Sequence, residues 1–302
     1  MPRIVISASR RTDIPAFFMP WFMASIATGQ FEVQNPYNHQ TTIVPASPEL
    51  VHSIVFWSKN FGPFLNQGYA EKLTNLGYRL FFNFTINSSQ PVLEPSLPPL
   101  NERLGQLARL TEIFGPDCVQ WRFDPICFFK ERSGHMGDNL DQFDIIARHA
   151  AHLGLKSCIT SFVDLYRKVL RRVKERHDLE LIDPPMDQKV TTTVQLANQL
   201  KNLGMEMRLC SEKDLLMHLP PDLGVTASAC IPSDRLTALY GPGISLARDG
   251  GQRRVAGCMC GASKDIGSYN LHPCRHNCLF CYANPACDAS PGIPQQPQCD
   301  RK

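Results

Sequence analysis

The sequence predicts an α/β fold built on a parallel β-sheet, arranged either as a full or partial barrel or as a doubly wound sheet. Short runs rich in Ile, Val, Phe and Trp alternate with longer helical patterns over the first 215 residues. Several of these runs are apolar almost throughout, which is typical of strands buried on both faces. The expected strands are residues 3–9, 53–58, 79–86, 119–124, 156–162 and 205–210, and the expected helices are residues 63–76, 99–114, 139–153, 164–176 and 188–203.

A local repeat supports this alternation of strands and helices. The segments LTNLGYRLFF, AAHLGLKSCI and LKNLGMEMRL each run from a helical pattern through Leu-Gly into an apolar strand. We expect Gly77, Gly154 and Gly204 to end their helices in the left-handed conformation and to turn the chain into the next strand. A further helix start is expected at Ser47, followed by Pro48 and Glu49, because Ser favours the N-cap and Pro the first helical position.

Polar residues stand at or just beyond the expected C-terminal end of each strand. They include Arg10, Arg11 and Asp13 after the first strand, Lys59 after the second, Thr85 and Asn87 at the third, Arg122 and Asp124 at the fourth, and Ser161 at the fifth. In a parallel barrel these ends share one rim, where active sites are built. Polar residues also occur at strand ends simply because the following loops are exposed to solvent. That explanation accounts for one or two polar ends more easily than for all of them.

Composition limits the class of protein. The chain has 302 residues, a net charge of +3 and 12 cysteines. The charge is too small to indicate nucleic-acid binding by itself, and no run approaches the roughly 20 apolar residues of a membrane span. No export signal is convincing, so we expect a cytoplasmic protein, in which clustered cysteines more often hold metal than form disulfides.

The chain divides into three expected parts. Residues 1–212 form the β/α core, and residues 213–285 form a Cys-rich segment that packs on the rim of the barrel. Residues 286–302 are rich in Pro, Gln and Ser and are expected to be disordered.

The segment CRHNCLFCYANP, residues 274–285, carries the strongest motif. Cys274, Cys278 and Cys281 have the spacing C-x3-C-x2-C, and three thiolates on one short loop can bind three different irons of a four-iron cubane. Phe280 is expected to pack over such a cluster and limit access of water. Zinc is the weaker alternative, because zinc knuckles prefer paired C-x2-C units.

These residues resemble the signature of the radical S-adenosylmethionine (SAM) superfamily, C-x3-C-x-aromatic-C. The resemblance implies a [4Fe–4S] cluster whose open iron chelates SAM, reductive cleavage of SAM to a 5′-deoxyadenosyl radical, and a partial TIM-like barrel of about six parallel strands. In this chain the loop lies at the C-terminal end, whereas the superfamily usually carries it after the first strand. The segments ISASRRTDIP, IVFWSKN, WRFDPI and SFVDLY, together with the cysteine loop, resemble an uncharacterised bacterial family, the domain-of-unknown-function family eighteen-forty-eight.

The resemblance also suggests roles for the rim residues. SAM carries a carboxylate, a sulfonium and a ribose, so the groups assigned to it are Arg122, Asp124, Thr85, Asn87 and Ser161, beside Phe280. The expected catalytic group facing a substrate is Arg10, Arg11, Asp13 and Lys59. Three cations favour a small substrate that bears phosphate or carboxylate, since guanidinium groups match such oxyanions. Each cation is equally well explained as a structural partner for a nearby carboxylate.

A second set of cysteines is a candidate metal site. Cys258 and Cys260 lie upstream of the loop, Cys210 ends the sixth strand, and Cys230 lies in SACIPSD. If the rim collects them, four thiolates can hold a second iron–sulfur cluster or a zinc ion. The alternative is that they are small buried residues.

Three functions remain open from the sequence. The leading one is a radical SAM-type enzyme that takes electrons from a donor such as flavodoxin or ferredoxin. The second is a non-catalytic protein whose metal staples the C-terminal segment to the barrel. The third is an enzyme of nucleic-acid modification or repair. The basic run RKVLRRVKER, residues 167–176, is expected to form a solvated helix face instead of a nucleic-acid contact.

Overall fold

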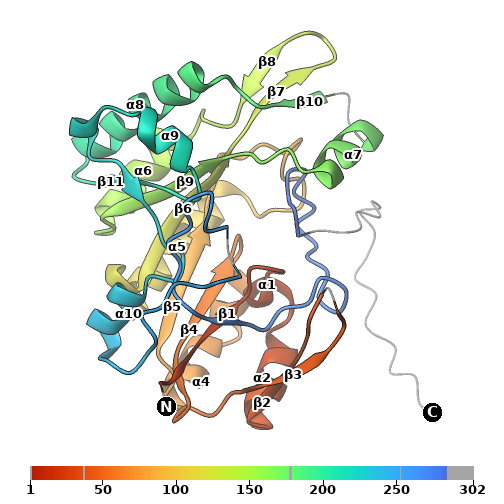
Figure 1. Ribbon diagram of the computed structural model, residues 1–302, viewed down its shortest axis with the longest axis vertical. Helices are drawn as coiled ribbons and strands as arrows, with labels where there is room; N and C mark the ends of the chain where they lie inside the picture. The colour runs from red at the N-terminus through yellow and green to blue at the C-terminus, as the bar shows by residue number, and fades with distance from the viewer. Residues whose placement is uncertain (1, 37, 177–178, 252, 284–302) are drawn as a thin grey trace.

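An eight-stranded parallel sheet forms the centre of the molecule in the computed structural model, which describes residues 2–36, 38–176, 179–251 and 253–283. Six inner strands follow one another in chain order, and one short strand is added at each edge (Figure 1). From edge to edge the strands are β12 (Thr226–Ala227), β11 (Glu206–Leu209), β9 (Ser157–Phe162), β6 (Val119–Ile126), β5 (Leu80–Thr85), β4 (Val51–Ser58), β1 (Ile4–Ala8) and β13 (Lys264–Asp265). The six inner strands are the six that the sequence predicts.

The sheet is open at both edges. Among the described residues, β12 pairs with β11 and β13 pairs with β1, but the two edge strands do not pair with each other. Of the alternatives that the sequence left open, a closed barrel is therefore not formed by the described residues, and the expected partial barrel stays a prediction. Each edge strand has only two residues, too few to carry the ladder of hydrogen bonds that closure needs.

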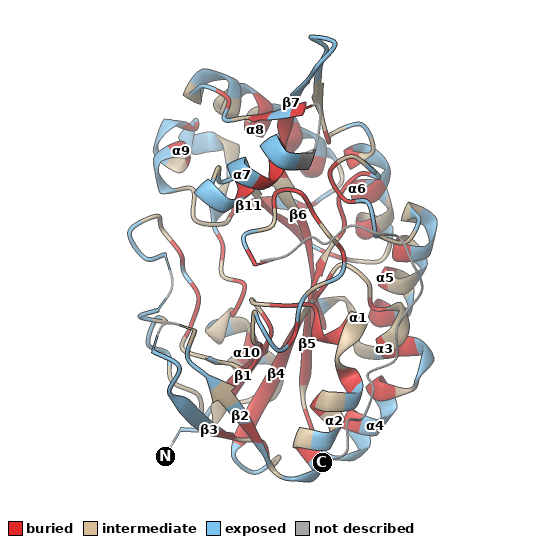
Figure 2. Cartoon of the chain, turned by 90° about the vertical axis from the view of Figure 1, so that its right-hand side faces the viewer, coloured by how far each residue is buried: buried red, intermediate tan, exposed pale blue. Residues whose placement is uncertain are grey.

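Helices cover one face of the sheet and bury its main core. The helices α3 (Gly62–Asn66), α4 (Tyr69–Asn75), α5 (Leu100–Phe114), α6 (Phe143–His152) and α8 (Met186–Asn202) contribute to this core. The even-numbered residues Phe56, Phe82 and Phe84 of β4 and β5 point into it, because successive side chains of a strand alternate between faces. Figure 2 shows the buried strands, with exposed residues on the outer surface of these helices.

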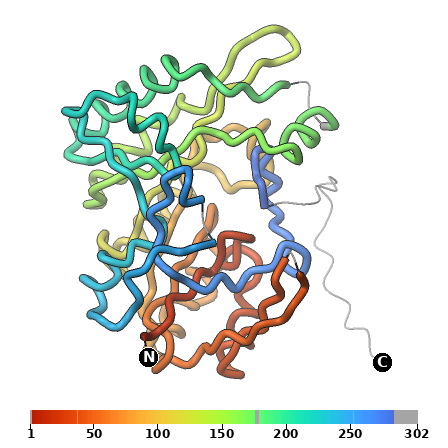
Figure 3. The backbone as a smooth tube through the Cα atoms, viewed as in Figure 1, coloured from red at the N-terminus to blue at the C-terminus, as the bar shows by residue number. Residues whose placement is uncertain are grey.

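The opposite face of the sheet is covered by the C-terminal third of the chain. Val5, Val55 and Phe81 pack there against Ile231 and against Leu236 of α10 (Ser233–Tyr240). Figure 3 shows this later part of the chain, in blue, running beside the N-terminal segment in red. The concave side of the open sheet is thus filled by residues distant in sequence. The division into residues 1–212 and 213–285 stays a prediction.

The remaining elements depart from the predictions in four places. The expected helix 63–76 is two helices, because Gly68 between them is in the left-handed region with φ of +68°. Residues 48–50 form a turn, so the expected helix start at Ser47 is wrong. The sequence did not predict the antiparallel hairpin of β2 (Gln30–Gln34) and β3 (Thr41–Pro45). It also did not predict the small sheet of β10 (Leu179–Ile182), β7 (Phe128–Glu131) and β8 (Met136–Asp138).

Four α-helices of the described residues lie outside the predicted alternation. They are α1 (Ile14–Phe17), α2 (Met19–Ala27), α9 (Lys213–His218) and α10, whereas α7 (Arg167–Arg176) was expected. No helix among the described residues is both long and apolar enough to cross a lipid bilayer. The tail expected to be disordered, residues 286–302, lies outside the described residues.

Candidate active site

The C-terminal cysteine loop is held in place by one buried arginine. Arg172 of α7 donates hydrogen bonds to the carbonyl oxygens of Cys278, Leu279 and Cys281, at 3.2, 2.8 and 2.9 Å. The expectation that residues 167–176 form only a solvated face is therefore wrong at this position, since Arg172 is 8% exposed. The arginine fixes the backbone that carries two of the three cysteines.

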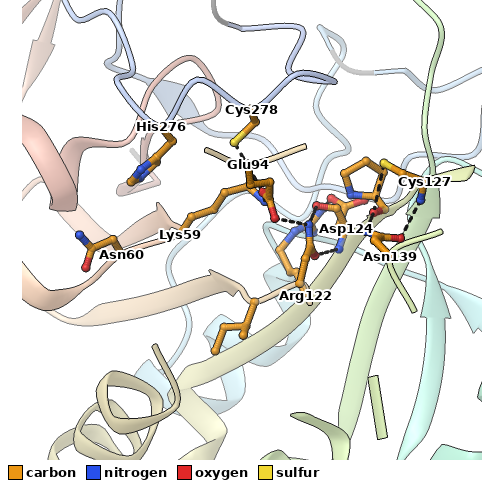
Figure 4. Close-up of polar contacts among 12 residues, drawn as sticks. Lys59, Asn60, Glu94, Arg122, Asp124, Cys127, Asn139, His276 and Cys278 are labelled. Atoms are coloured by element: carbon orange, nitrogen blue, oxygen red, sulfur yellow. Dashed lines mark hydrogen bonds and ion pairs between the residues drawn. The ribbon is translucent and has the colours of Figure 1, made fainter. Parts of the chain in front are cut away.

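Cys278 opens onto a buried ion pair. Its thiol donates to Oε1 of Glu94 at 3.5 Å, and Nζ of Lys59 lies 2.6 Å from the same oxygen (Figure 4). The Lys59 ammonium also stands 5.3 Å from the centre of the Phe280 ring. Phe280 is buried with Leu279 and Cys278 in a small apolar cluster, as expected for a residue that shields the loop from water.

Asp13 links the first strand to the loop. Its carboxylate accepts hydrogen bonds from the Ser58 hydroxyl at 2.7 Å, the Lys59 backbone amide at 2.9 Å and the His276 Nε2 at 2.8 Å. It also caps α1 by accepting from the amide of Ala16 at 3.0 Å. Four donors thus converge on one buried carboxylate, which holds its neighbours in place, and the catalytic role expected for Asp13 stays a prediction.

Arg122 and Asp124 lie between the two groups of cysteines. Their side chains form an ion pair, and the Ser161 hydroxyl donates to the other oxygen of Asp124. Asn87 accepts from the Asp124 amide at 2.8 Å and donates to Glu94 at 3.3 Å. One polar network therefore connects Asp124 through Asn87 and Glu94 to Cys278.

The chain just after Asp124 is also held by side-chain hydrogen bonds. Asn139 accepts from the Cys127 amide at 2.9 Å and donates to the Pro125 carbonyl at 3.0 Å. Thr85 lies beside Arg122 in the strand register, and the role expected for it in binding SAM stays a prediction.

The electrostatics of this network keep its groups charged. Burial lowers the pKa of Lys59, but nearby negative charge, that of Glu94 above all, outweighs it, and the net pKa is raised. Burial alone would raise the pKa of Asp124. The positive charge of Arg122 and the hydrogen bond from Ser161 outweigh burial, so the net pKa of Asp124 is lowered. An ammonium and a carboxylate are thus both present near Cys278 at neutral pH.

The thiols of the loop are strongly shielded from water. Burial raises the pKa of both Cys274 and Cys278, and nearby negative charges raise it further. A bound metal reverses such a shift, because thiols lose their protons when they ligate.

The two arginines expected to face a substrate are paired with carboxylates. Arg10 lies 3.7 Å from Asp249 and donates to Ser263, and its guanidinium stacks on Trp57. Arg11 lies 3.9 Å from Asp265 and donates to the carbonyl of Gly267. The structure therefore favours the alternative reading, in which these cations join the C-terminal segment to the first strand.

The second set of cysteines gathers on the inner face of the sheet. The sulfurs of Cys210 and Cys230 lie 3.8 Å apart, and the Cys230 amide donates to the Cys260 sulfur at 3.3 Å. A hydrogen bond from Cys230 lowers the pKa of Cys210 to about 6, and bonds from Cys230 and Cys258 lower the pKa of Cys260. These contacts join Cys210, Cys230 and Cys260, and Cys258 is buried in the same cluster.

No three His, Cys, Asp or Glu side chains within the described ranges are arranged to hold a single metal ion. This result concerns donors around one ion. The thiolates of a cubane each bind a different iron and are spaced more widely than the ligands of one zinc ion. The donor chemistry of three thiols on one ordered loop therefore still fits an iron–sulfur cluster.

Two histidines, His272 and His276, pack against the first helices beside the loop. His276 bonds Asp13 and packs 4.7 Å from the Phe17 ring. His272 is buried between Phe18 and Trp21, and burial lowers its pKa to about 4. Both histidines position the loop against α1 and α2.

Sequence reasoning missed four residues of this site: Glu94, Arg172, Asp249 and Asp265. Glu94 lies in the long segment between β5 and α5, where no motif marks it. Arg172 was hidden in a basic run, although its neighbours Val169 and Val173 at helical spacing indicate a buried stripe. Asp265 accepts from Ser7, Ser9 and the Arg10 amide at 2.9, 2.7 and 2.7 Å, contacts across more than 250 residues that no local pattern predicts.

Comparison with models of protein families gives a match over most of the chain. The model of a family described as a domain of unknown function, DUF1848, matches residues 5–283. No curated protein matches the sequence.

Proposed function

The chain belongs to the DUF1848 family, and from that premise we propose that it is a radical SAM-type enzyme with a [4Fe–4S] cluster on Cys274, Cys278 and Cys281. The observation that carries the proposal is the ordered cysteine loop, clamped by Arg172 and opening onto the Lys59–Glu94 pair. The chain order of the six inner strands agrees with the partial barrel that the radical SAM resemblance implies.

When bound, such a cluster would supply an electron and an open iron for reductive cleavage of SAM, with the electron coming from a donor such as flavodoxin or ferredoxin. The protein would supply binding and orientation. Asp124 and Glu94 offer carboxylates near the loop, and Lys59 offers a cation for which the SAM carboxylate would compete with Glu94. These charges match the amino, carboxylate and hydroxyl groups of SAM.

Several residues would orient these binding groups without touching the ligand. Asn87 joins Asp124 to Glu94, and Ser161 and Arg122 fix the two carboxylate oxygens of Asp124. Asp13 and His276 hold the start of the loop against α1. Phe280 excludes water from the side of Lys59.

The geometry gives less support to an anionic substrate than the sequence did. Arg10, Arg11 and Lys59 each have a carboxylate partner within 4 Å, so an incoming phosphate or carboxylate has to compete with it. We therefore leave the substrate as a small molecule without a preferred charge.

The metal-staple alternative is also weakened. The C-terminal segment is already fastened by Arg172, by the Asp13–His276 contact and by Asp265, all of them protein contacts. A metal that served only to fasten it would be redundant.

The test is reconstitution under anaerobic conditions with iron and sulfide, followed by metal analysis and a SAM-cleavage assay with a chemical reductant. We expect about four iron atoms in the loop site and release of 5′-deoxyadenosine. Cys274→Ala, Cys278→Ala and Cys281→Ala should each abolish that release. Cys158→Ala, a buried cysteine in β9 away from the loop, is the matched control and should retain it.

Two results would contradict the proposal. One is a loop site that takes zinc in preference to iron during reconstitution. The other is a reduced cluster whose spectrum does not respond to SAM and that yields no 5′-deoxyadenosine.

A further inference from the structure

Four cysteines outside the C-terminal loop converge from three separate segments. Cys210 directly follows β11, Cys230 lies between β12 and α10, and Cys258 and Cys260 precede β13. Cys230 contacts the sulfur of Cys210 through its own sulfur, at 3.8 Å, and that of Cys260 through its amide, at 3.3 Å. All four belong to the apolar cluster on the inner face of the sheet, three of them buried and Cys210 partly buried.

Two guanidinium groups stand beside these thiols. Arg122 donates to the Cys230 sulfur, and Arg10 lies within electrostatic range of Cys230 and Cys260. The Trp57 ring lies between the two arginines, 5.4 Å from the guanidinium carbon of Arg10 and 5.5 Å from that of Arg122. Burying a guanidinium group costs desolvation free energy. A neutral thiol offsets little of this cost, whereas an anionic thiolate offsets much more of it.

Two buried donors at this place have no hydrogen-bond partner among the described residues. They are Nη2 of Arg10 and Nε1 of Trp57. Buried donors are almost always paired, so two unpaired ones beside four thiols indicate that an acceptor belongs here. Thiolate sulfurs on a metal, or the inorganic sulfides of a cluster, are acceptors of this kind.

We propose that Cys210, Cys230, Cys258 and Cys260 form a second metal centre, held by four thiolates and distinct from the C-terminal loop. A divalent ion with four thiolates, or a four-iron cubane with four thiolates, carries two net negative charges. Arg10 and Arg122 offset these charges. The ligand class is a soft, sulfur-binding metal: zinc or an iron–sulfur cluster.

Simple core packing explains the four cysteines less well. Cys158, by contrast, is buried in the core beneath the helices, and its thiol lies 3.8 Å from the carbonyl oxygen of Ile159. Cys210, Cys230 and Cys260 instead contact one another, and Arg122 contacts Cys230. The described side chains are not already arranged around a single ion, and none of the four cysteines lies within a strand, so the proposal requires the loops around Cys230 and Cys258 to move until the sulfurs surround the metal.

The test separates this centre from the loop cluster by removing the loop cysteines first. The variant Cys274→Ala/Cys278→Ala/Cys281→Ala is produced as the full chain and purified anaerobically. Zinc, iron and sulfide are measured before and after reconstitution, and Co²⁺ is used as a spectroscopic probe of thiolate ligation. The second sample adds Cys230→Ala to this variant, and the control adds Cys158→Ala.

We expect the loop-deficient variant to bind one equivalent of metal that the added Cys230→Ala removes and the added Cys158→Ala leaves in place. Iron with sulfide identifies a cluster, and zinc with a cobalt–thiolate spectrum after exchange identifies a single-ion site. A loop-deficient variant that is folded by circular dichroism but takes up no metal overturns the proposal. So does metal that survives Cys230→Ala. Neither result bears on SAM cleavage by the loop, which is measured on the wild-type loop alone.

Discussion

The side chain of Arg172, in α7, holds a loop that lies more than 100 residues later in the chain. It binds three carbonyl oxygens of the segment from Cys278 to Cys281. Hydrogen bonds from a charged donor are stronger than neutral ones, so this contact orders the loop before any metal is bound. Arg171, the preceding residue of α7, is exposed.

Replacing Arg172 by Ala should therefore loosen the loop. We expect iron to be lost to a chelator about 10-fold faster or more, since outer contacts of this kind tune metal retention. Arg171→Ala is the matched control and should behave as wild type. Hydrogen exchange at the amides of residues 278–281 in metal-free protein gives a second readout. Unchanged exchange and iron loss in Arg172→Ala would show that the clamp has no role.

His52 gives the fold a dependence on pH. Its Nε2 donates to the Gly241 carbonyl at 2.9 Å, and burial, with the charges of Arg3 and Arg79, lowers its pKa. The folded protein thus favours the neutral ring, while the unfolded chain takes up a proton near pH 6.5. Because the unfolded state then binds more protons, stability is present above that pH and falls as the pH drops below it.

His52→Gln keeps a donor for the Gly241 carbonyl and removes the titration. We expect the free energy of unfolding to fall less steeply in this variant than in wild type between about pH 7 and about pH 5. Urea denaturation at several pH values measures the two slopes. His135→Gln, at an exposed histidine, should follow wild type. Equal slopes for His52→Gln and wild type would mean that another group causes the acid sensitivity.

The repeated helix-to-strand turn is the element that the sequence predicted best. Gly77, Gly154 and Gly204 have φ of +87°, +85° and +69°, in the left-handed region that was expected for each. The turn works because glycine alone adopts this conformation without steric cost. Helix boundaries were less certain, as the break at Gly68 shows.

Gly204 and Gly105 form a matched pair for testing this turn. A Cβ at either position meets no atom within 4 Å, so packing does not distinguish them. Gly204→Ala should destabilise the protein by about 1 kcal/mol because of the left-handed backbone. Gly105→Ala, in the interior of α5, should stabilise it by up to about 1 kcal/mol. Denaturant unfolding measures both. The same sign for the two variants would refute a backbone origin.

At the scale of the whole molecule, the first strand and the C-terminal segment depend on each other. Asp265 of β13 binds Ser7, Ser9 and the Arg10 amide, and the Tyr282 hydroxyl donates to the Arg10 carbonyl at 2.9 Å. The inner face of the sheet is covered by residues near Cys230 and Leu236. The described molecule thus builds its core from both ends of the chain.

A polypeptide of residues 1–212 should therefore not fold as an independent unit. It would expose Val5, Val55 and Phe81 to water, an apolar face too large for a soluble monomer. We expect strong binding of a hydrophobic dye and loss of cooperative unfolding, measured against the full chain. A monomeric fragment with a sharp urea transition would instead show that the boundary at residue 212 separates two domains.

The sequence by itself determined the six inner strands, their order along the chain, the glycine turns and the cysteine loop. These features follow from local patterns: apolar runs, helical periodicity, the conformational freedom of glycine and the spacing of three thiols. Tertiary structure alone decided that the sheet stays open and that residues near the C-terminus fill its inner face. It also decided that Glu94, Arg172, Asp249 and Asp265 are the partners of the predicted site. Such pairings join residues 35 to more than 250 positions apart. They depend on which charges the fold buries together, and no window of sequence contains both members of a pair.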